Sequence, residues 1–336
     1  MSLSVPRQGV QKDTETELAR NGIVRLALPL PYKPGVVNIY LLKGRQPALI
    51  DTGLHESVSR TRLWEALSRE GIQPDDIEHI FLTHGHADHA GAAAYMARNY
   101  GTTVWVHALE KPRFNGQHAD FVTKMVPELY RRLGADQEAL DNAAETIQSS
   151  ADTYLHMHVD NIQFLEHGQK LPVEGYDLHV LFTPGHSPGS VCFLEKNQKI
   201  IFTGDTLLSE GVPRPTLNLD EQGGPFFNVL TELKKSIASI IEVKADLALP
   251  GHVPPASLSD LISKANKALE KKEGLVLKKC STDFTPYDLI RKRDKRLKSA
   301  YLLIDLYQTR AILEVLRTEG AVKMRVRNGV EHFSVM

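Results

Sequence analysis

The strongest constraint in this sequence is a pattern that recurs four times, in which an apolar segment runs directly into a turn carrying histidine or aspartate. The four segments are IFLTHGHADH, VLFTPGH, IIFTGD and LALPGH, and they end at His89, His186, Asp205 and His252. Each turn contains a glycine, which allows the backbone to bend sharply. Loops at the carboxyl ends of strands in open α/β folds share one edge of the sheet. We therefore expect four loops distant in sequence to meet at one edge.

The first of these turns is dense in metal-binding side chains, because His84, His86, Asp88 and His89 lie within six residues. Residues i and i+2 of an extended segment point to the same side, so His84 and His86 can bind one ion. The chain then bends toward a predicted helix, so that Asp88 and His89 can face a second ion. Imidazole and carboxylate ligands without thiolate suit Zn²⁺, and also iron or manganese. Two such ions about 3.5 to 4 Å apart can ionise a bridging water and stabilise a leaving oxygen or sulfur.

The motifs THGHADH, TPGHSPGS, GDT and PGH, preceded by Asp51 in LIDTG, resemble the metallo-β-lactamase superfamily in order and spacing. The resemblance spans residues 20–256 and implies an α/β fold, namely a four-layer αββα sandwich. It implies a first metal site of His84, His86 and His186 and a second of Asp88, His89 and His252. Asp205 would bridge the two ions. Asp51 would orient a histidine ligand without itself binding metal, as outer carboxylates do.

Within this superfamily, the chain is similar to a branch that includes a mitochondrial β-lactamase-like endoribonuclease, fungal polyketide thioesterases and bacterial hydrolases without an assigned substrate. The TPGHSPGS stretch is also similar to glyoxalase II. The C-terminal basic and aromatic pattern with which glyoxalase II binds glutathione is missing. This difference argues against a glutathione thioester as the substrate.

Apolar periodicity predicts strands that alternate with helices. Strands are expected at 23–30, 36–42, 48–50, 77–82, 102–106, 178–182, 191–194, 200–202 and 247–249. Helices are expected at 57–70, 90–100, 121–133, 137–149 and 229–243. The mostly helical stretch 109–161 interrupts the strands and predicts a cap inserted into a catalytic domain of residues 20–256.

A second domain is predicted beyond Pro254-Pro255, a dipeptide that marks a boundary. Residues 257–336 combine helical stretches at 258–273, 286–293 and 300–319 with a hairpin of 322–326 and 330–335 around Asn328-Gly329. Three helices followed by a two-stranded wing predict a small winged-helix-like domain.

Charge is distributed unevenly, although the net charge is only −1. Residues 258–336 hold 17 Lys and Arg against 10 Asp and Glu, which leaves an acidic remainder. The basic run at 291–298 is typical of a solvated helix end, and the alternative is a patch that contacts phosphates.

The two cysteines, Cys192 and Cys280, lie far apart and outside any CxxC motif, which excludes a disulfide framework and a thiolate zinc site. No apolar segment is typical of a signal peptide or long enough to span a bilayer. We therefore expect a cytoplasmic protein that does not bind membranes.

Histidines outside the four motifs have structural interpretations. His156 and His158 form an HxH pair without a partner motif, so surface exposure or packing is favoured over metal binding. His107, at the end of a predicted strand, is expected to pack, and His55 and His79 are expected to be incidental.

Three classes of function remain. The ligand set favours a binuclear hydrolase in which a metal-bridging hydroxide cleaves a small-molecule ester or thioester of CoA or a carrier protein, with Asp88 and Asp205 as catalytic carboxylates. The alternative is a metal-dependent endoribonuclease or phosphodiesterase on single-stranded RNA, which the basic C-terminal region favours and the acidic remainder opposes. The third is a nucleic-acid-binding regulator with a metal-sensing domain, but the apolar residues near 301–306 favour docking or a homodimer contact. The absence of a secretory signal argues against β-lactam hydrolysis.

Overall fold

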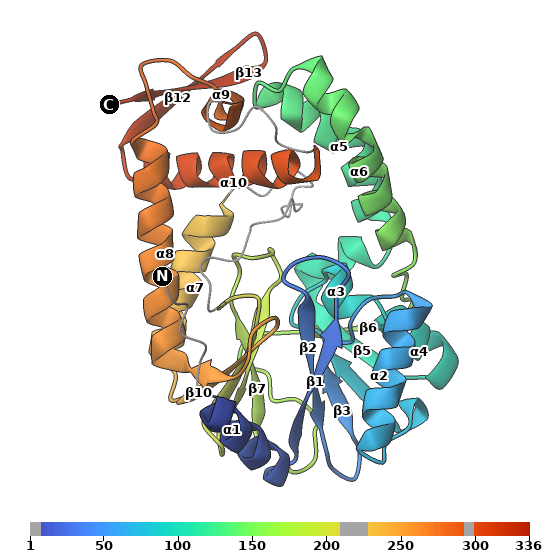
Figure 1. Cartoon of the computed structure of the whole chain (residues 1–336). Coiled ribbons are helices and arrows are strands. Elements are labelled where there is room, and N and C mark those ends of the chain that lie inside the picture. The colour runs from blue at the N-terminus through green and yellow to red at the C-terminus, as the bar shows by residue number, and fades with distance from the viewer. Residues whose placement is uncertain (1–7, 209–227, 292–298) are drawn as a thin grey trace.

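The computed structural model describes residues 8–208, 228–291 and 299–336. Two β-sheets pack face to face, and helices cover the outer face of each sheet (Figure 1). This arrangement is the four-layer αββα sandwich that the family resemblance implies. Within the described residues, no helix is both long enough and apolar enough to cross a membrane.

The first sheet has six strands in chain order. They are β1 (Ile23–Pro29), β2 (Val36–Leu42), β3 (Ala48–Ile50), β4 (His79–Phe81), β5 (Thr103–His107) and β6 (Ile162–Leu165). Strands β3 to β6 run parallel, whereas β1, β2 and β3 pair antiparallel. Helices α2 (Ser57–Arg69) and α4 (Ala93–Tyr100) cover the outer face. Strand β2 is almost entirely buried because both of its faces are covered.

The second sheet has five strands in the order β11-β10-β9-β8-β7. Their bounds are β7 (Leu178–Phe182), β8 (Val191–Glu195), β9 (Ile200–Gly204), β10 (Leu247–Pro250) and β11 (Ala256–Ser257). Strand β8 is antiparallel to both β7 and β9, and β10 is parallel to β9. Strands β7, β9 and β10 therefore end at the same edge. Helices α7 (Val229–Ile241) and α8 (Leu258–Leu277) pack on the outer face.

Aromatic side chains fill the space between the sheets. Tyr40 meets Phe202 edge-on at 5.3 Å, and Phe81 meets Phe193 at 6.2 Å. These side chains are at most 2% exposed, so each contributes about 1.5–3 kcal/mol through burial. Leu18, from helix α1 (Gln8–Arg20), packs against the same core. The sequence pattern did not indicate helix α1, because its residues are mostly polar.

The inserted segment forms two long helices, α5 (Gln117–Arg132) and α6 (Gln137–Leu155), after the short helix η2 (Ala108–Arg113). The prediction of two helices is confirmed, but α5 begins four residues earlier and α6 continues six residues beyond Ser149. Serines at 149–150 are weak helix formers, whereas burial of Ala151 stabilises the final turns. Helix α5 runs from the sandwich toward the C-terminal elements, and α6 runs back to the first sheet (Figure 1).

The C-terminal region contains the predicted three helices and hairpin. They are α8, α9 (Pro286–Arg291), α10 (Ser299–Thr318), β12 (Val322–Arg327) and β13 (Val330–Val335). Asn328 and Gly329 both have positive φ, as a tight hairpin turn requires. Residues 292–298, which hold most of the predicted basic run, lie outside the described residues. The domain boundaries and the winged-helix assignment stay predictions.

Two further short helices complete the fold. Helix η1 (Pro74–Asp76) precedes β4, and helix α3 (Ala87–Ala90) follows it directly. Two of the candidate ligands, Asp88 and His89, lie on helix α3.

Candidate metal centre

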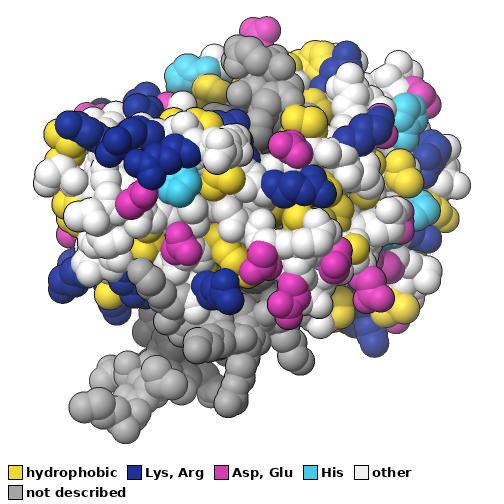
Figure 2. Space-filling model, turned by 90° about the horizontal axis from the view of Figure 1, so that it is seen from above, with side chains coloured by type: hydrophobic (Ala, Val, Ile, Leu, Met, Phe, Trp, Pro, Cys, Tyr) yellow, Lys and Arg dark blue, Asp and Glu magenta, His cyan; other side chains and the backbone are white. Residues whose placement is uncertain are grey.

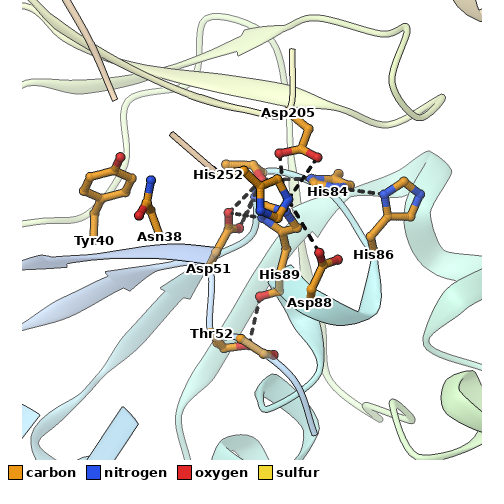
Figure 3. Close-up of polar contacts among 12 residues, drawn as sticks. Asn38, Tyr40, Asp51, Thr52, His84, His86, Asp88, His89, Asp205 and His252 are labelled. Carbon is orange, nitrogen blue, oxygen red and sulfur yellow. Dashed lines mark hydrogen bonds and ion pairs between the residues drawn. The ribbon is translucent and has the colours of Figure 1, made fainter. Parts of the chain in front are cut away.

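Five loops that follow strands of both sheets meet at one edge of the sandwich. Asp51 follows β3, His84 and His86 follow β4, His186 follows β7, Asp205 follows β9 and His252 follows β10. Figure 3 shows most of these side chains, which extend toward one another from the separate strands. The predicted meeting of the four motif turns is therefore observed. The role of the individual residues as metal ligands stays a prediction.

The first group of donor atoms comprises the imidazoles of His84, His86 and His186. His86 Nδ1 lies 2.9 Å from His84 Nε2 and 2.8 Å from His186 Nε2. All three residues are buried, at 1%, 7% and 5% exposure. Because their donor atoms lie within 4.8 Å of one another, one cation can contact all three.

The second group comprises Asp88, His89 and His252. His89 Nε2 lies 3.1 Å from His252 Nε2, and Asp88 Oδ2 lies 3.5 Å from the same atom of His252. Helix α3 supplies Asp88 and His89 from its first turn, directly after His86. The donor atoms of this second group also lie within 4.8 Å of one another.

Asp205 lies between the two groups. Its Oδ1 is 3.4 Å from His89 Nε2, while its Oδ2 is 3.5 Å from His186 Nε2 and 3.3 Å from His252 Nε2. Asp205 Oδ1 is buried and accepts no hydrogen bond from the described residues. A buried carboxylate oxygen of this kind is costly unless a cation satisfies it.

The outer nitrogens of three histidines are fixed by hydrogen bonds. His252 Nδ1 donates to the carbonyl oxygen of Val36 at 2.7 Å, and His89 Nδ1 donates to Asp51 Oδ2 at 2.7 Å. Thr83 Oγ1 donates to Asp51, so it accepts from His84 Nδ1 at 3.0 Å. Each bond places a proton on Nδ1 and leaves the inner Nε2 lone pair available for metal. The role of Asp51 in supporting a metal ligand stays a prediction, and its hydrogen bonds to His89 and Thr83 are compatible with that role.

Electrostatics differ between the two groups. Burial, with the neighbouring histidines and Arg113, holds the pKa values of His84 and His86 well below the ordinary value. Burial likewise lowers the pKa of His186 to about 4. These imidazoles are therefore neutral at pH 7, as metal ligands must be.

Burial acts to lower the pKa of His89 and His252, but the neighbouring carboxylates, Asp205 foremost, together outweigh it and raise both pKa values. Burial acts to raise the pKa of Asp205, yet His252 and His89 hold it well below the ordinary value. A cation bound between these groups would take the place of the shared protons. The neutral imidazoles, the ionised carboxylate and the absence of thiolate in these groups fit a divalent metal.

Gly251 makes the close approach of two loops feasible. A Cβ atom at this position would lie 2.6 Å from Asp205 Oδ1 and 2.6 Å from His89 Cε1. The glycine of the LALPGH motif is therefore required by the side chains beside it, in addition to its role in the turn.

Several residues that position the site belong to no motif of the sequence. Asn38 Nδ2 donates to the carbonyl oxygens of Pro250 and Val253, each at 2.8 Å, and Tyr40 Oη donates to that of Pro250 at 2.8 Å. They hold the loop of His252 against β2. A buried asparagine in an otherwise apolar strand is the signal that could have identified Asn38. Glu110 and Arg113, in η2, also belong to no motif.

The remaining histidines lie outside the metal groups of the described residues. His107 stacks on Phe182 at 4.4 Å, as the packing interpretation predicts. His55 stacks on His156 at 4.9 Å, and His158 pairs with Asp160 at the surface.

Comparisons with known proteins agree with this geometry. Residues 32–252 match the family model described as "Metallo-beta-lactamase superfamily". A probable metallo-hydrolase of Bacillus subtilis, YqjP, is 24% identical over 94% of this chain and 98% of its own length. Hydroxyacylglutathione hydrolase GloC of Haemophilus influenzae is 30% identical, over 40% of this chain and 52% of its own. Atrochrysone carboxyl ACP thioesterase of Aspergillus fumigatus is 27% identical, over 70% of this chain and 56% of its own.

Two solved structures resemble the whole chain. A metallo-beta-lactamase family protein from Thermus thermophilus is 27% identical, with a TM-score of 0.76 over 94% of this chain and 99% of that one. A beta-lactamase domain protein from Burkholderia ambifaria is 19% identical, with a TM-score of 0.78 over 94% and 92%. The arrangement of sandwich, inserted helices and C-terminal region therefore recurs as one fold.

Proposed function

This chain belongs to the metallo-beta-lactamase superfamily and is a metal-dependent hydrolase, and from that premise we propose that it uses two divalent cations to cleave a small-molecule ester or thioester. In this proposal His84, His86 and His186 bind the first ion, and Asp88, His89 and His252 bind the second. We propose Zn²⁺ as the native ion, with iron and manganese as alternatives that the same ligands accept.

The observation that carries the proposal is the position of Asp205. Its two carboxylate oxygens lie 3.3 to 3.5 Å from histidine nitrogens of both groups. A carboxylate in that position suits a ligand shared by two ions. It also supports a site for two ions rather than one.

Divalent cations, when bound, lower the pKa of a coordinated water and polarise the carbonyl oxygen of a substrate. The residues of this chain supply the remaining requirements. The hydrogen bonds that the three imidazole Nδ1 atoms donate to Val36, Asp51 and Thr83 fix the rings before substrate arrives, which reduces the reorganisation needed during reaction.

Among the site carboxylates, Asp88 is the one able to exchange protons with solvent. Its side chain is 17% exposed, against 8% for Asp205 and 2% for Asp51. We assign to Asp88 the acceptance of the proton released by the attacking water, at its carboxylate, and its transfer to the leaving group or to solvent.

The relatives and the sequence of this chain support the proposed substrate class. Two relatives are named for substrates with an acyl group on glutathione or on a carrier protein. Because this chain lacks the pattern for glutathione, we propose an acyl thioester of CoA or of a carrier protein.

The experiment is a substrate panel combined with metal analysis. The purified protein is loaded with Zn²⁺, its metal content is measured by mass spectrometry, and hydrolysis is assayed on acyl-CoA esters, an acyl carrier protein, a simple ester and a short single-stranded RNA. We expect about two ions per chain and thioester cleavage that stops on chelation and returns with metal. Hydrolysis that persists in metal-free protein would refute the proposal, and so would protein that binds no metal.

A specific surface feature favours RNA as the second candidate substrate. Lys323, Arg325 and Arg327 alternate along β12 and are all exposed, so they share one face of the hairpin. Figure 2, which views the molecule from above, shows Lys and Arg side chains gathered at one side of the upper face. If these side chains contact the phosphates of RNA, the affinity for RNA falls steeply as the salt concentration rises. RNA cleavage with that salt dependence, together with inactivity on thioesters, would favour the second candidate.

A further inference from the structure

Glu110 is a buried carboxylate that the proposed chemistry does not use. It lies in η2, directly after strand β5, and is 1% exposed. Burying a carboxylate so completely costs several kcal/mol unless hydrogen bonds and a cation compensate. The contacts of Glu110 show what compensates the cost.

The carboxylate of Glu110 accepts hydrogen bonds from two loops of the metal centre. Its Oε2 accepts from the backbone N–H of Gly85 at 2.9 Å. Its Oε1 accepts from the Ser187 hydroxyl at 2.6 Å and from the backbone N–H of Gly189 at 2.8 Å. Gly85 stands between His84 and His86, and Ser187 directly follows His186. A single carboxylate therefore holds together the two loops that present the first group of donor atoms.

Two motif glycines are adapted to this contact. A Cβ atom at Gly85 would lie 2.8 Å from Glu110 Oε2, and one at Gly189 would lie 2.7 Å from Glu110 Cγ. Both distances are too short for any side chain. The glycines of HGH and SPGS thus leave room for Glu110 beside the backbone.

Arg113 supplies the positive charge. Its Nε donates to Glu110 Oε2 at 3.1 Å, and the arginine is itself only 3% exposed. Arg113 also donates to His118 Nε2 of α5 at 3.1 Å and lies over the ring of Tyr154 of α6 at 5.0 Å. The inserted helices therefore hold the arginine in place from the side opposite the metal loops.

We propose that Glu110 is a positioning residue that sets the spacing of His84, His86 and His186 by holding their two loops to one carboxylate. The inference rests on the proposed metal centre and adds to it the residue that fixes the geometry of the first ion. Glu110 does not touch the ion or the substrate. It acts through the backbone of Gly85 and the Ser187–Gly189 turn.

The test uses Glu110→Gln, which keeps the size of the side chain and removes its charge. In either orientation of the glutamine amide, its NH₂ would face a backbone N–H that can only donate, either that of Gly85 or that of Gly189. Zn²⁺ affinity is measured by competition with a chromogenic chelator, and the geometry of the site is followed by the visible absorption of the Co²⁺-loaded protein. We expect affinity to fall about 10- to 100-fold, as for other residues that orient metal ligands, and the cobalt bands to shift.

Glu195→Gln is the matched control. Glu195 is also fully buried, and it accepts hydrogen bonds from the backbone N–H groups of Asp177 and Gln198. Glu195 lies at the end of β8 that is remote from the metal centre. Val191, at the other end of β8, comes directly after the loop that holds His186. We expect Glu195→Gln to lower the melting temperature of the metal-free protein while leaving Zn²⁺ affinity and the cobalt spectrum unchanged.

The outcomes separate the two proposals. If the wild-type protein binds no metal in the same titration, the proposed function fails. If the wild type binds metal and Glu110→Gln matches it in affinity and spectrum, only the role of Glu110 is overturned. An equal loss of Zn²⁺ affinity in Glu195→Gln would also overturn the role of Glu110, because general destabilisation of the fold would then explain both losses.

A milder variant decides the matter if Glu110→Gln does not fold. Ser187→Ala removes one of the four hydrogen bonds and keeps the carboxylate. We expect a smaller loss of Zn²⁺ affinity, with a shifted cobalt spectrum. Wild-type affinity and spectrum in Ser187→Ala would then count against the positioning role.

Discussion

At the scale of single residues, the candidate metal centre holds a buried carboxylate, that of Asp205, whose negative charge is balanced by the neighbouring histidines. Asp205 is 8% exposed and lies within 3.5 Å of imidazole nitrogens of His89, His186 and His252. Its pKa lies well below the ordinary value because His252 and His89 outweigh its burial. The side chain therefore stays ionised and available to cations.

We predict that Asp205→Ala loses metal and activity together. Removing the carboxylate between the two groups takes a ligand from both, so the loss in metal affinity should exceed about 100-fold, the upper range for residues that only support ligands. Metal content after dialysis and the rate of thioester hydrolysis measure the effect. Asp177→Ala is the control, since Asp177 pairs with Lys170 away from the site. Full activity in Asp205→Ala would show that no shared ligand is needed.

A second residue-scale prediction concerns Gly251. A methyl group there would lie 2.6 Å from Asp205 Oδ1 and from His89 Cε1, so Gly251→Ala must displace one of these side chains. We expect Zn²⁺ affinity to fall at least about 10-fold. Gly274→Ala is the matched control, because a Cβ atom at Gly274 meets no atom within 4 Å. Chelator competition on both variants measures the effect, and equal affinities would contradict the assigned crowding.

At the scale of elements, the site is formed where strands end and helices begin. Strands β3, β4, β7, β9 and β10 all end at the same edge, so side chains far apart in sequence become neighbours. Helix η2 contacts this edge through Glu110. Arg113 of η2 then links Glu110 to the inserted helices. The inserted helices are therefore joined to the metal loops by polar contacts.

His118 of α5 gives a pH-dependent prediction at this scale. Burial, followed by the charge of Arg113, holds its pKa well below the ordinary value. Below about pH 6.5, His118 is therefore protonated in the unfolded chain but stays neutral in the folded protein. The free energy of unfolding consequently falls as the pH falls. For one such group the loss between about pH 7.5 and 5.5 is about 1.4 kcal/mol.

The variant His118→Gln should lack this loss, because its amide oxygen still accepts from Arg113 and does not titrate. The free energy of unfolding of metal-free protein, measured in urea at both pH values, checks the prediction. The other buried histidines are common to both proteins and cancel in the difference. An identical pH dependence of the two proteins would show that His118 titrates normally.

At the scale of the whole molecule, the inserted helices and the C-terminal region form one hydrophobic cluster. Ile290 of α9 and Leu306 of α10 pack with α5 and α6, including Leu129 and Leu140. The fully buried Glu331 of β13 forms an ion pair with Arg132 of α5, at 2.6 Å between Oε1 and Nη2, and accepts a hydrogen bond from Arg310 of α10 at Oε2. The inserted helices are thus held at one end by the metal loops and at the other by the C-terminal elements.

We predict that Leu306→Ala loosens the inserted helices although the substitution lies more than a hundred residues away in sequence. Truncating a fully buried leucine costs about 2–5 kcal/mol. Limited proteolysis with mass spectrometry should show new cleavage within 117–155. Leu313→Ala is the control: Leu313 lies on the same helix and is equally buried, but packs in the separate cluster with α7 and α8. The same cleavage pattern in both variants would contradict the separation of the two clusters.

The sequence indicated the layered fold through its resemblance to a known family, and its local patterns identified the candidate ligands. Each motif that holds candidate ligands follows a short apolar strand, and the strand and its turn are specified by neighbouring residues. The hairpin at Asn328-Gly329 was predicted for the same reason. Local patterns identified the candidate residues because strand, glycine turn and side chain are contiguous in the chain.

Only the tertiary structure decided which atoms lie next to which. Glu110 carries no motif, and its role becomes visible only when the β4 and β7 loops are packed against η2. The placement of Asp205 between both donor groups, and the joining of α5 and α6 to the C-terminal region, likewise depend on contacts between distant segments. Such contacts are set by the shape and burial of the assembled core, which no local pattern of residues encodes.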